Sequence, residues 1–274
     1  MQQIKRIDSE PLLLHGDFRK FLFDGTIKPN SIDLTVTSPP YDNLRTYNHP
    51  LAWGWPAFSA VSSGLWEATK PGGVVVWVVG DATIKGDETG TSFNQVAQMK
   101  RCGFLLHDTM IYEKLSVGMY DPRNMRYKSA FEFMFVFSKG KPATYNPIKD
   151  KPNKNPGRSL CRSNGRTNKG ALRRAKHPAL VENEFQDRFN VWAYYTGNNL
   201  STKDKIAFGH PAIFPERLAH DHIISWSNEA DTVLDPMMGS GTTGKMAKLL
   251  RRKFIGIEID SEYYQIATKR IEAY

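Results

Sequence analysis

Cysteine is scarce in this sequence, with only Cys102 and Cys161 among 274 residues. The two positions share no metal-ligand spacing, which argues against a zinc site, and two cysteines cannot build a disulfide framework. We therefore expect no metal centre and a protein suited to a reducing compartment such as the cytoplasm.

Long apolar runs are also missing. The longest, Val74–Val79, fits a buried strand but is far shorter than the roughly 20 residues that a membrane-spanning helix needs. Residues 1–14 carry charged side chains without the apolar stretch that follows them in a secretory signal, so we expect no signal peptide. Both absences predict a protein that does not enter a membrane.

Positive charge is confined to one segment. The whole chain has a net charge of +9, yet residues 139–176 alone hold twelve Lys or Arg against one acid, a net charge of +11. The remaining residues hold 25 bases and 27 acids, a net charge of −2. A basic segment of this kind favours an acidic partner such as nucleic acid.

The same segment is rich in Asn, Gly and Pro and lacks apolar periodicity, so we expect an extended loop region. Lys and Arg spaced along an extended chain release counterions from a polyanion. Phosphate contact is therefore the favoured hypothesis, and a plain solvated loop is the alternative. The candidate DNA-binding side chains are Lys149, Lys151, Lys154, Arg158, Arg162, Arg166, Lys169, Arg173 and Arg174.

Short apolar runs alternate with helical patterns elsewhere in the chain. Strands are expected at Ser31–Val36, Val74–Val79, Thr232–Leu234 and Phe254–Ile257, and a strand leaving the core at Phe131–Phe137. Helices are expected at Ser92–Cys102, Phe214–Trp226, Thr242–Leu250 and Ser261–Ile271, the last with Ser261 as its N-cap. This alternation predicts an α/β fold with a doubly wound sheet.

A glycine-rich turn lies between the expected strand and helix of residues 232–250. The strand ends at Asp235, and Gly239 and Gly241 let the backbone approach a ligand beside the free N–H groups of the helix start. The turn lacks the lysine of a Walker phosphate loop, and a purely structural turn stays an alternative. The next strand ends near Glu258, where a ribose-binding carboxylate belongs, so nucleoside binding is favoured.

A second rigid corner ends the strand in Asp33–Tyr41 (DLTVTSPPY). Consecutive prolines fix the backbone and remove two N–H donors, leaving carbonyls free to accept. The Ser38 hydroxyl oxygen and the Pro39 carbonyl can accept hydrogen bonds from an exocyclic amino group of a base, and Tyr41 can stack on a base flipped out of the duplex. An ordinary Pro-Pro turn is the alternative.

Together, the two motifs resemble those of the β group of S-adenosylmethionine-dependent DNA amino-methyltransferases, in which the motif order is permuted. Thr37–Tyr41 (TSPPY) resembles the catalytic motif, and Asp235–Thr243 (DPMMGSGTT) resembles the cofactor motif. The catalytic motif comes first and the basic segment lies between the two, which is the layout of this group. The resemblance covers nearly the whole chain except Lys139–Leu200.

The resemblance implies roles for individual residues. His210–Pro215 would cup the methionine end of the cofactor, and Asp17 would meet its adenine amino group. Met237 or Met238 stands where an aromatic side chain is frequent, and a thioether packs there as well. The implied catalytic residues are Ser38, Pro39, Pro40 and Tyr41. The implied cofactor-binding residues are Asp17, His210, Pro211, Phe214, Asp235, Met237, Gly239, Ser240, Gly241, Thr242 and Glu258.

The resemblance also implies a class I methyltransferase fold, with a seven-stranded, mostly parallel Rossmann-like sheet that contains a β-hairpin. The C-terminal strand and helix would lie beside the N-terminal strand. Residues 1–138 would form the catalytic half, residues 139–200 a basic target-recognition insertion, and residues 201–274 the cofactor-binding half.

The implied activity is methyl transfer to an exocyclic amino group in duplex DNA. The serine of SPPY is typical of enzymes that modify N4 of cytosine, and N6 of adenine is the alternative. An RNA or protein amide methyltransferase and a non-catalytic DNA-binding protein are the other hypotheses. A homodimer, a cognate restriction endonuclease and a cytoplasmic location would fit the family, as would a bacterial, archaeal or phage-encoded origin.

Overall fold

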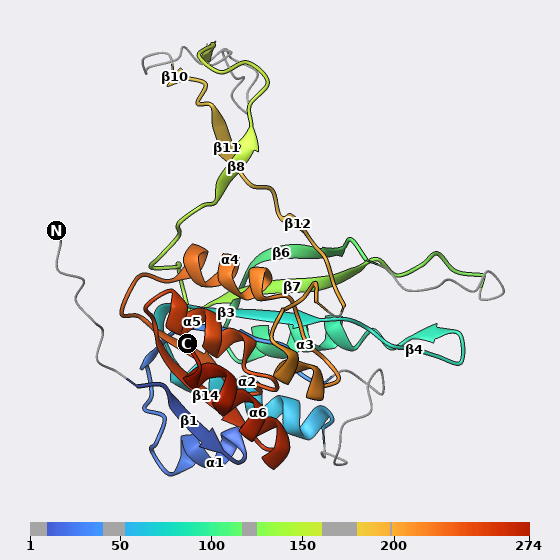
Figure 1. The fold of residues 1–274 in the computed structure, drawn as a ribbon, viewed down its shortest axis with the longest axis vertical. Coiled ribbons are helices and arrows are strands. Elements are labelled where there is room, and N and C mark those ends of the chain that lie inside the picture. The colour runs from blue at the N-terminus through green and yellow to red at the C-terminus, as the bar shows by residue number, and fades with distance from the viewer. Residues whose placement is uncertain (1–9, 41–52, 117–124, 161–179, 198) are drawn as a thin grey trace. The chain divides into compact units, whose positions relative to one another are not determined.

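The computed structural model describes residues 10–40, 53–116, 125–160, 180–197 and 199–274 (Figure 1). The chain divides into two compact units. The main unit comprises Met1–Asn146 with Asn190–Tyr274, and the smaller unit comprises Pro147–Phe189. Among the described residues, no helix is long and apolar enough to cross a membrane.

An eight-stranded sheet forms the centre of the main unit, in the order β1-β14-β13-β2-β3-β7-β6-β12. Only β7 runs antiparallel to its neighbours, so the mostly parallel sheet is confirmed. The strands are β1 (Leu12–His15), β2 (Ile32–Thr37), β3 (Thr69–Val79), β6 (Leu105–Lys114), β7 (Phe131–Ser138), β12 (Val191–Tyr194), β13 (Thr232–Asp235) and β14 (Lys253–Glu258). The count exceeds the expected seven because β12, which lies within the predicted insertion, pairs in parallel with β6.

Helices pack in two groups around this sheet. In one group α2 (Trp55–Ala68) contacts α1 (Phe18–Phe23) and α3 (Thr91–Arg101). In the other group α5 (Thr242–Leu249) contacts α4 (Glu216–Trp226) and α6 (Ser261–Glu272). A 3-10 helix, η2 (Lys205–Gly209), and a small hairpin of β4 (Thr83–Ile84) and β5 (Asp87–Glu88) are the other elements among the described residues of this unit.

The predicted helices are all present, with ends that differ by at most two residues. The N-cap of α6 was assigned to the wrong residue. Asp260, not Ser261, holds that position, because its carboxylate accepts from the backbone N–H groups of Glu262 and Tyr263 at 2.8 and 3.0 Å. Ser261 is instead the first helical residue.

The two ends of the chain meet in the sheet. Strand β1 pairs in parallel with β14, with Leu12 opposite Ile255 and His15 opposite Glu258. Figure 1 shows the blue N-terminal strand beside the red C-terminal elements. This pairing confirms the expected closure of a permuted chain.

Strand β7 differs from its expected place. The sequence suggested a strand leaving the core, whereas β7 lies inside the sheet between β3 and β6. Residues Met134–Ser138 are buried, and Val74–Val79 of β3 lie beside Phe133–Ser138 in register. The β6–β7 pair is the predicted hairpin.

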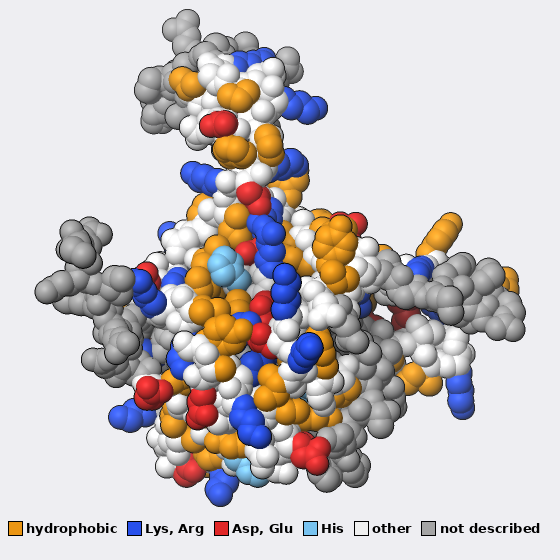
Figure 2. Space-filling view, viewed as in Figure 1, with side chains coloured by type: hydrophobic (Ala, Val, Ile, Leu, Met, Phe, Trp, Pro, Cys, Tyr) orange, Lys and Arg blue, Asp and Glu red, His pale blue; other side chains and the backbone are white. Residues whose placement is uncertain are grey.

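The described part of the smaller unit, residues 147–160 and 180–189, contains two antiparallel strand pairs. Strand β8 (Lys149–Pro152) pairs with β11 (Phe185–Asp187), and β9 (Ser159–Leu160) pairs with β10 (Leu180–Val181). The Nζ atom of Lys151 lies 3.0 Å from the centre of the Phe189 ring. Figure 2 shows Lys and Arg side chains on the surface of the smaller unit.

The compact smaller unit is shorter than the predicted insertion of residues 139–200. At one end, Lys139 donates to the backbone carbonyls of Trp66 and Thr69. At the other end, β12 belongs to the main sheet. Composition marked residues 139–200 as an insertion, whereas these contacts assign both ends of that range to the main unit.

Candidate active site

A cavity of about 630 Å³ lies where the parallel strands of the main unit end. Its walls come from the turn after β1, the end of β2, the ends of the β6–β7 pair, the turn between β13 and α5, and the end of β14. Ligands bind in doubly wound sheets at this carboxyl edge, because loops from distant parts of the sequence converge there.

Most of the predicted site residues are brought together around this cavity. The lining includes Asp17, Ser38, Pro39, Pro40, His210, Pro211, Phe214, Met237, Gly239, Ser240, Thr242 and Glu258. Asp235 and Gly241 are not among the lining residues. Tyr41 lies outside the described residues, as do Arg162, Arg166, Lys169, Arg173 and Arg174.

Asp235 connects the two motifs from behind the cavity wall. Its Oδ1 accepts a hydrogen bond of 2.8 Å from the hydroxyl of Thr37, the residue immediately before Ser38. The same oxygen accepts from the backbone N–H of Met237 at 3.2 Å. Asp235 therefore fixes the end of β2 against the beginning of the glycine turn.

Burial raises the pKa of Asp235 to about 7, even though the hydrogen bond from Thr37 opposes the shift. A carboxyl group with a raised pKa gains a proton on folding between its ordinary pKa of 3.8 and about 7. Its contribution to stability is thus fully present below pH 4 and is lost as the pH rises through 7.

We expect Asp235→Asn to remove this pH dependence, because asparagine keeps the acceptor oxygen and carries no charge. Urea unfolding of both proteins between pH 4 and pH 8 measures the effect. The free energy of unfolding of the wild type should fall relative to that of the variant as the pH rises. A difference between the two proteins that stays constant over this range would contradict the assignment.

The glycine turn allows a close approach of backbone to side chains. Gly239 has φ +49°, and a Cβ atom there would lie 2.9 Å from Nε2 of His210. Gly241 precedes α5 with φ +76°, and its Cβ atom would lie 3.1 Å from Cα of Ala267. A side chain at either position would clash as well as strain the backbone.

Glu258 holds the turn from the end of the neighbouring strand. One carboxylate oxygen accepts from the N–H of Gly239 at 2.8 Å, and the other accepts from the N–H of Asp260 at 2.9 Å. Burial raises the pKa of Glu258 despite these backbone hydrogen bonds. The carboxylate is therefore fixed in place while it also lines the cavity.

His210 is a neutral part of the wall. Burial lowers its pKa to about 4, which outweighs the opposing effects of the Ala212 backbone and of Asp260. Its Nδ1 lies 3.1 Å from the backbone nitrogen of Ala212, and its ring meets that of Tyr263 edge to face. At neutral pH the imidazole adds no charge to the cavity.

Asp17 contributes to the wall from the turn after β1. Its carboxylate caps α1 by accepting from the N–H of Arg19 at 2.9 Å, and it forms an ion pair with the Arg19 guanidinium. The hydrogen bond from this side chain lowers the pKa of Asp17, although burial opposes it. Asp17 is thus an anion within reach of a ligand.

The sequence did not single out Arg270, whose guanidinium is 1% exposed behind the glycine turn. Its Nη1 donates at 3.0 Å to the Ser240 carbonyl and to the Thr242 hydroxyl. Its Nε donates to Asp204 at 2.8 Å and its Nη2 to Glu216 at 2.6 Å. Arg270 shares one face of α6 with the buried Tyr263 and Ala267. This helical spacing was the signal in the sequence that could have indicated that Arg270 is buried.

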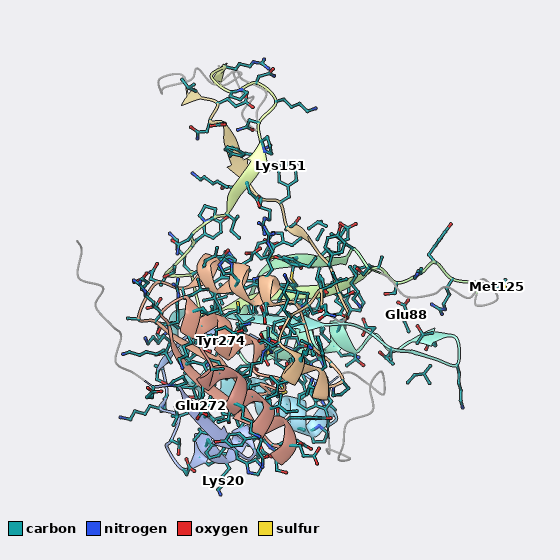
Figure 3. All side chains as sticks on the ribbon, in the orientation of Figure 1. Lys20, Glu88, Met125, Lys151, Glu272 and Tyr274 are labelled. Carbon is teal, nitrogen blue, oxygen red and sulfur yellow. The ribbon has the colours of Figure 1, made fainter. Side chains whose placement is uncertain are left out.

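Lys245 completes this buried cluster. Its Nζ lies 2.8 Å from carboxylate oxygens of both Asp204 and Glu216. The Tyr274 hydroxyl, at the end of α6 (Figure 3), donates to Asp204 at 2.8 Å. Burial alone would raise the pKa of Asp204, but the hydrogen bonds from Lys245, Arg270 and Tyr274 lower it.

Three further lining residues had no sequence-based assignment. Tyr112 and Lys114 lie at the end of β6, and Glu132 lies at the start of β7. Lys114 and Glu132 form an ion pair of 2.5 Å. Their polar side chains at the ends of two expected or observed strands were the signal that the sequence offered.

A family model described as DNA methylase, of the N6/N4 type, matches residues 32–269. Among curated proteins, the orphan methyltransferase M.BamHII of Bacillus amyloliquefaciens is 54% identical over 89% of this chain and 90% of its own length.

Two solved structures resemble the fold. The PvuII DNA methyltransferase (cytosine-N4-specific) has a TM-score of 0.66 at 22% identity, over 96% of this chain and 86% of its own. The complex of M1.HpyAVI with SAM has a TM-score of 0.63 at 22% identity, over 96% of this chain and 99% of its own. These likenesses support the class I methyltransferase architecture.

Proposed function

The chain belongs to the DNA methylase family of the N6/N4 type, and on that basis we propose that it transfers a methyl group from S-adenosylmethionine to N4 of cytosine in DNA. One observation carries the proposal. A single cavity is lined both by Ser38–Pro39–Pro40 at the end of β2 and by the glycine turn after β13.

The residues of the cavity fit S-adenosylmethionine, which supplies an electrophilic methyl group on a positively charged sulfur. Asp17 and Glu258 offer carboxylates to a nucleoside at two points of the wall. Met237 lies in the wall, where a flexible thioether side chain can pack against a cofactor, and the glycine turn allows backbone to come close. A relative in fold, M1.HpyAVI, has been solved with this cofactor.

The catalytic work of this chain is alignment. The amino nitrogen of cytosine is conjugated with its ring and is a poor nucleophile. In the proposed complex, the Ser38 hydroxyl oxygen and the Pro39 carbonyl accept hydrogen bonds from that amino group and turn its lone pair toward the methyl donor. Pro39 is buried, and Pro40 adds no competing N–H.

The choice of cytosine rests on Ser38, since a serine at this position is typical of N4-cytosine enzymes. Adenine N6 is the alternative, because the same two acceptors can hold either amino group. Digestion of methylated plasmid to nucleosides, followed by mass spectrometry, tests the choice. N4-methylcytosine is expected, and N6-methyladenine without N4-methylcytosine would reject it.

A flipped target base is part of the proposal, because an amino group inside the duplex cannot reach the cavity. The basic smaller unit would then hold the DNA backbone. Four of the predicted DNA-binding residues lie in its described part, Lys149, Lys151, Lys154 and Arg158. A homodimer and a cognate endonuclease stay predictions.

We expect Lys154→Gln combined with Arg158→Gln to raise KM for DNA and to leave cofactor affinity unchanged. Both side chains are exposed, and each phosphate contact contributes about 0.9 to the slope of log affinity against log salt. The slope should therefore become less steep by roughly two. The matched control is Lys28→Gln with Lys100→Gln, which removes the same charge from exposed sites on the main unit. Equal salt slopes for the two double variants would contradict phosphate contact.

A further inference from the structure

Tyr112, Lys114 and Glu132 form a polar cluster in the cavity that the proposed chemistry has not used. Tyr112 is opposite Glu132 in the register of β6 and β7, and Lys114 is two residues farther along β6. Side chains two residues apart on a strand, and side chains directly opposite each other, share one face of a sheet. All three line the cavity, and an ion pair fixes the Lys114 ammonium against Glu132.

The Tyr112 hydroxyl is the unusual member of this cluster. Tyr112 is 2% exposed, and no residue in the described part of the chain partners its hydroxyl. Burial, aided by the charge of Glu132, raises the pKa of Tyr112, so the hydroxyl keeps its proton. A buried hydroxyl without a partner is destabilising, so a ligand that brings an acceptor to this position would be favoured.

The cluster lies at the same edge of the sheet as the catalytic loop, and both line the cavity. Strands β3 and β7 lie between β2 and β6, and neighbouring strands are about 4.8 Å apart, so β6, which carries Tyr112 and Lys114, is roughly 14 Å from β2. Gly80, which follows β3, contributes no side chain to this space, and a Cβ atom there would lie 3.2 Å from Cγ of Glu132. A base with a hydrogen bond of about 2.9 Å at each side fits within such a gap.

We propose that Tyr112 and Lys114, the latter oriented by Glu132, hold the ring edge of the target base and select cytosine. This inference rests on the proposed function. Beside its amino group cytosine carries two acceptors, ring N3 and the O2 carbonyl, whereas adenine carries N1 followed by a C–H group. The Tyr112 hydroxyl and the Lys114 ammonium supply two donors. Both donors are satisfied by cytosine, and one is left unpaired by adenine.

The test compares Tyr112→Phe and Lys114→Met with the wild type on plasmid DNA. The measurements are KM and kcat for DNA, the Kd of S-adenosylmethionine, Tm, and the ratio of N4-methylcytosine to N6-methyladenine. Tyr145→Phe and Lys100→Met are matched controls, since both residues are exposed. We expect each cluster variant to lose about 10-fold or more in kcat/KM, as the loss of a specific base contact does. Cofactor Kd should stay within about twofold.

A purely structural role for Tyr112 predicts that Tyr112→Phe lowers Tm and activity together. Our proposal predicts that activity falls while Tm stays at or above that of the wild type, because the removed hydroxyl has no partner in the described part of the free protein. If the wild type makes N4-methylcytosine and both variants keep full kcat/KM, this inference fails while the proposed function stands. If the wild type makes only N6-methyladenine, both fail.

Discussion

Ser38→Ala is expected to lower kcat for DNA methylation by about 10²-fold or more, the effect of removing one oriented hydrogen-bonding group from an active site. Ser38 lines the same cavity as the glycine turn, and alanine cannot accept a hydrogen bond from the base amino group. Methyl transfer from tritiated S-adenosylmethionine to plasmid DNA under saturating cofactor measures the loss.

The cofactor Kd of Ser38→Ala should match that of the wild type, because the residues that face the proposed cofactor are untouched. Ser63→Ala is the matched control. Its hydroxyl donates to the Ser59 carbonyl on α2 and is exposed, so full activity is expected. Wild-type kcat in Ser38→Ala would reject the chemistry assigned to the loop. Tyr41→Ala, which tests base stacking, is expected to lose activity in the same way.

The two motifs were predictable because each is local in sequence. One short apolar strand is followed directly by Ser38–Pro39–Pro40, and another ends shortly before Gly239, so both motifs lie at the carboxyl end of a strand. In a parallel sheet such ends share one edge, so alternation of strands and helices was enough to expect one cavity. The hydrogen bond between Thr37 and Asp235 is the contact that joins them.

The Tyr112 cluster was not predictable in the same way. Its place depends on β7 inserting antiparallel between β3 and β6, and nothing in the apolar pattern of Phe131–Phe137 specifies a partner strand. Register then decides which residues face the cavity, since a shift of one residue reverses every side chain. Lys114 and Glu132 therefore looked like ordinary polar strand ends.

The ends of the smaller unit differ from those of the predicted insertion for a related reason. Charge and composition describe a segment by its residue types, whereas a compact unit is defined by packing. Val191–Tyr194 follow the basic segment, yet Trp192 and Tyr194 alternate inward as a strand of the main sheet. Tyr194 also donates to the buried Asp221 at 2.9 Å.

Arg270→Met is expected to have the largest effect on stability, a loss of about 3–5 kcal/mol in the free energy of unfolding. Arg270 is 1% exposed and donates to Asp204 and Glu216. Methionine fills much of the volume but leaves two carboxylates to share the single ammonium of Lys245. Removing the buried guanidinium from this cluster leaves carboxylates that water reaches only in part without enough positive charge. Urea unfolding at pH 7 measures the loss.

The same substitution should weaken cofactor binding, which a merely stabilising ion pair would not do. Nη1 of Arg270 donates to the Ser240 carbonyl and to the Thr242 hydroxyl, so its loss frees the turn that lines the cavity. Arg270→Lys keeps the charge but cannot reach all of these acceptors in one planar fork, and an intermediate effect is expected. Arg217→Met is the matched control, because Arg217 is 73% exposed and lies 3.9 Å from its carboxylate partner, a geometry worth less than about 1 kcal/mol. Equal stability losses in Arg270→Met and Arg217→Met would show that the buried cluster does not support the turn.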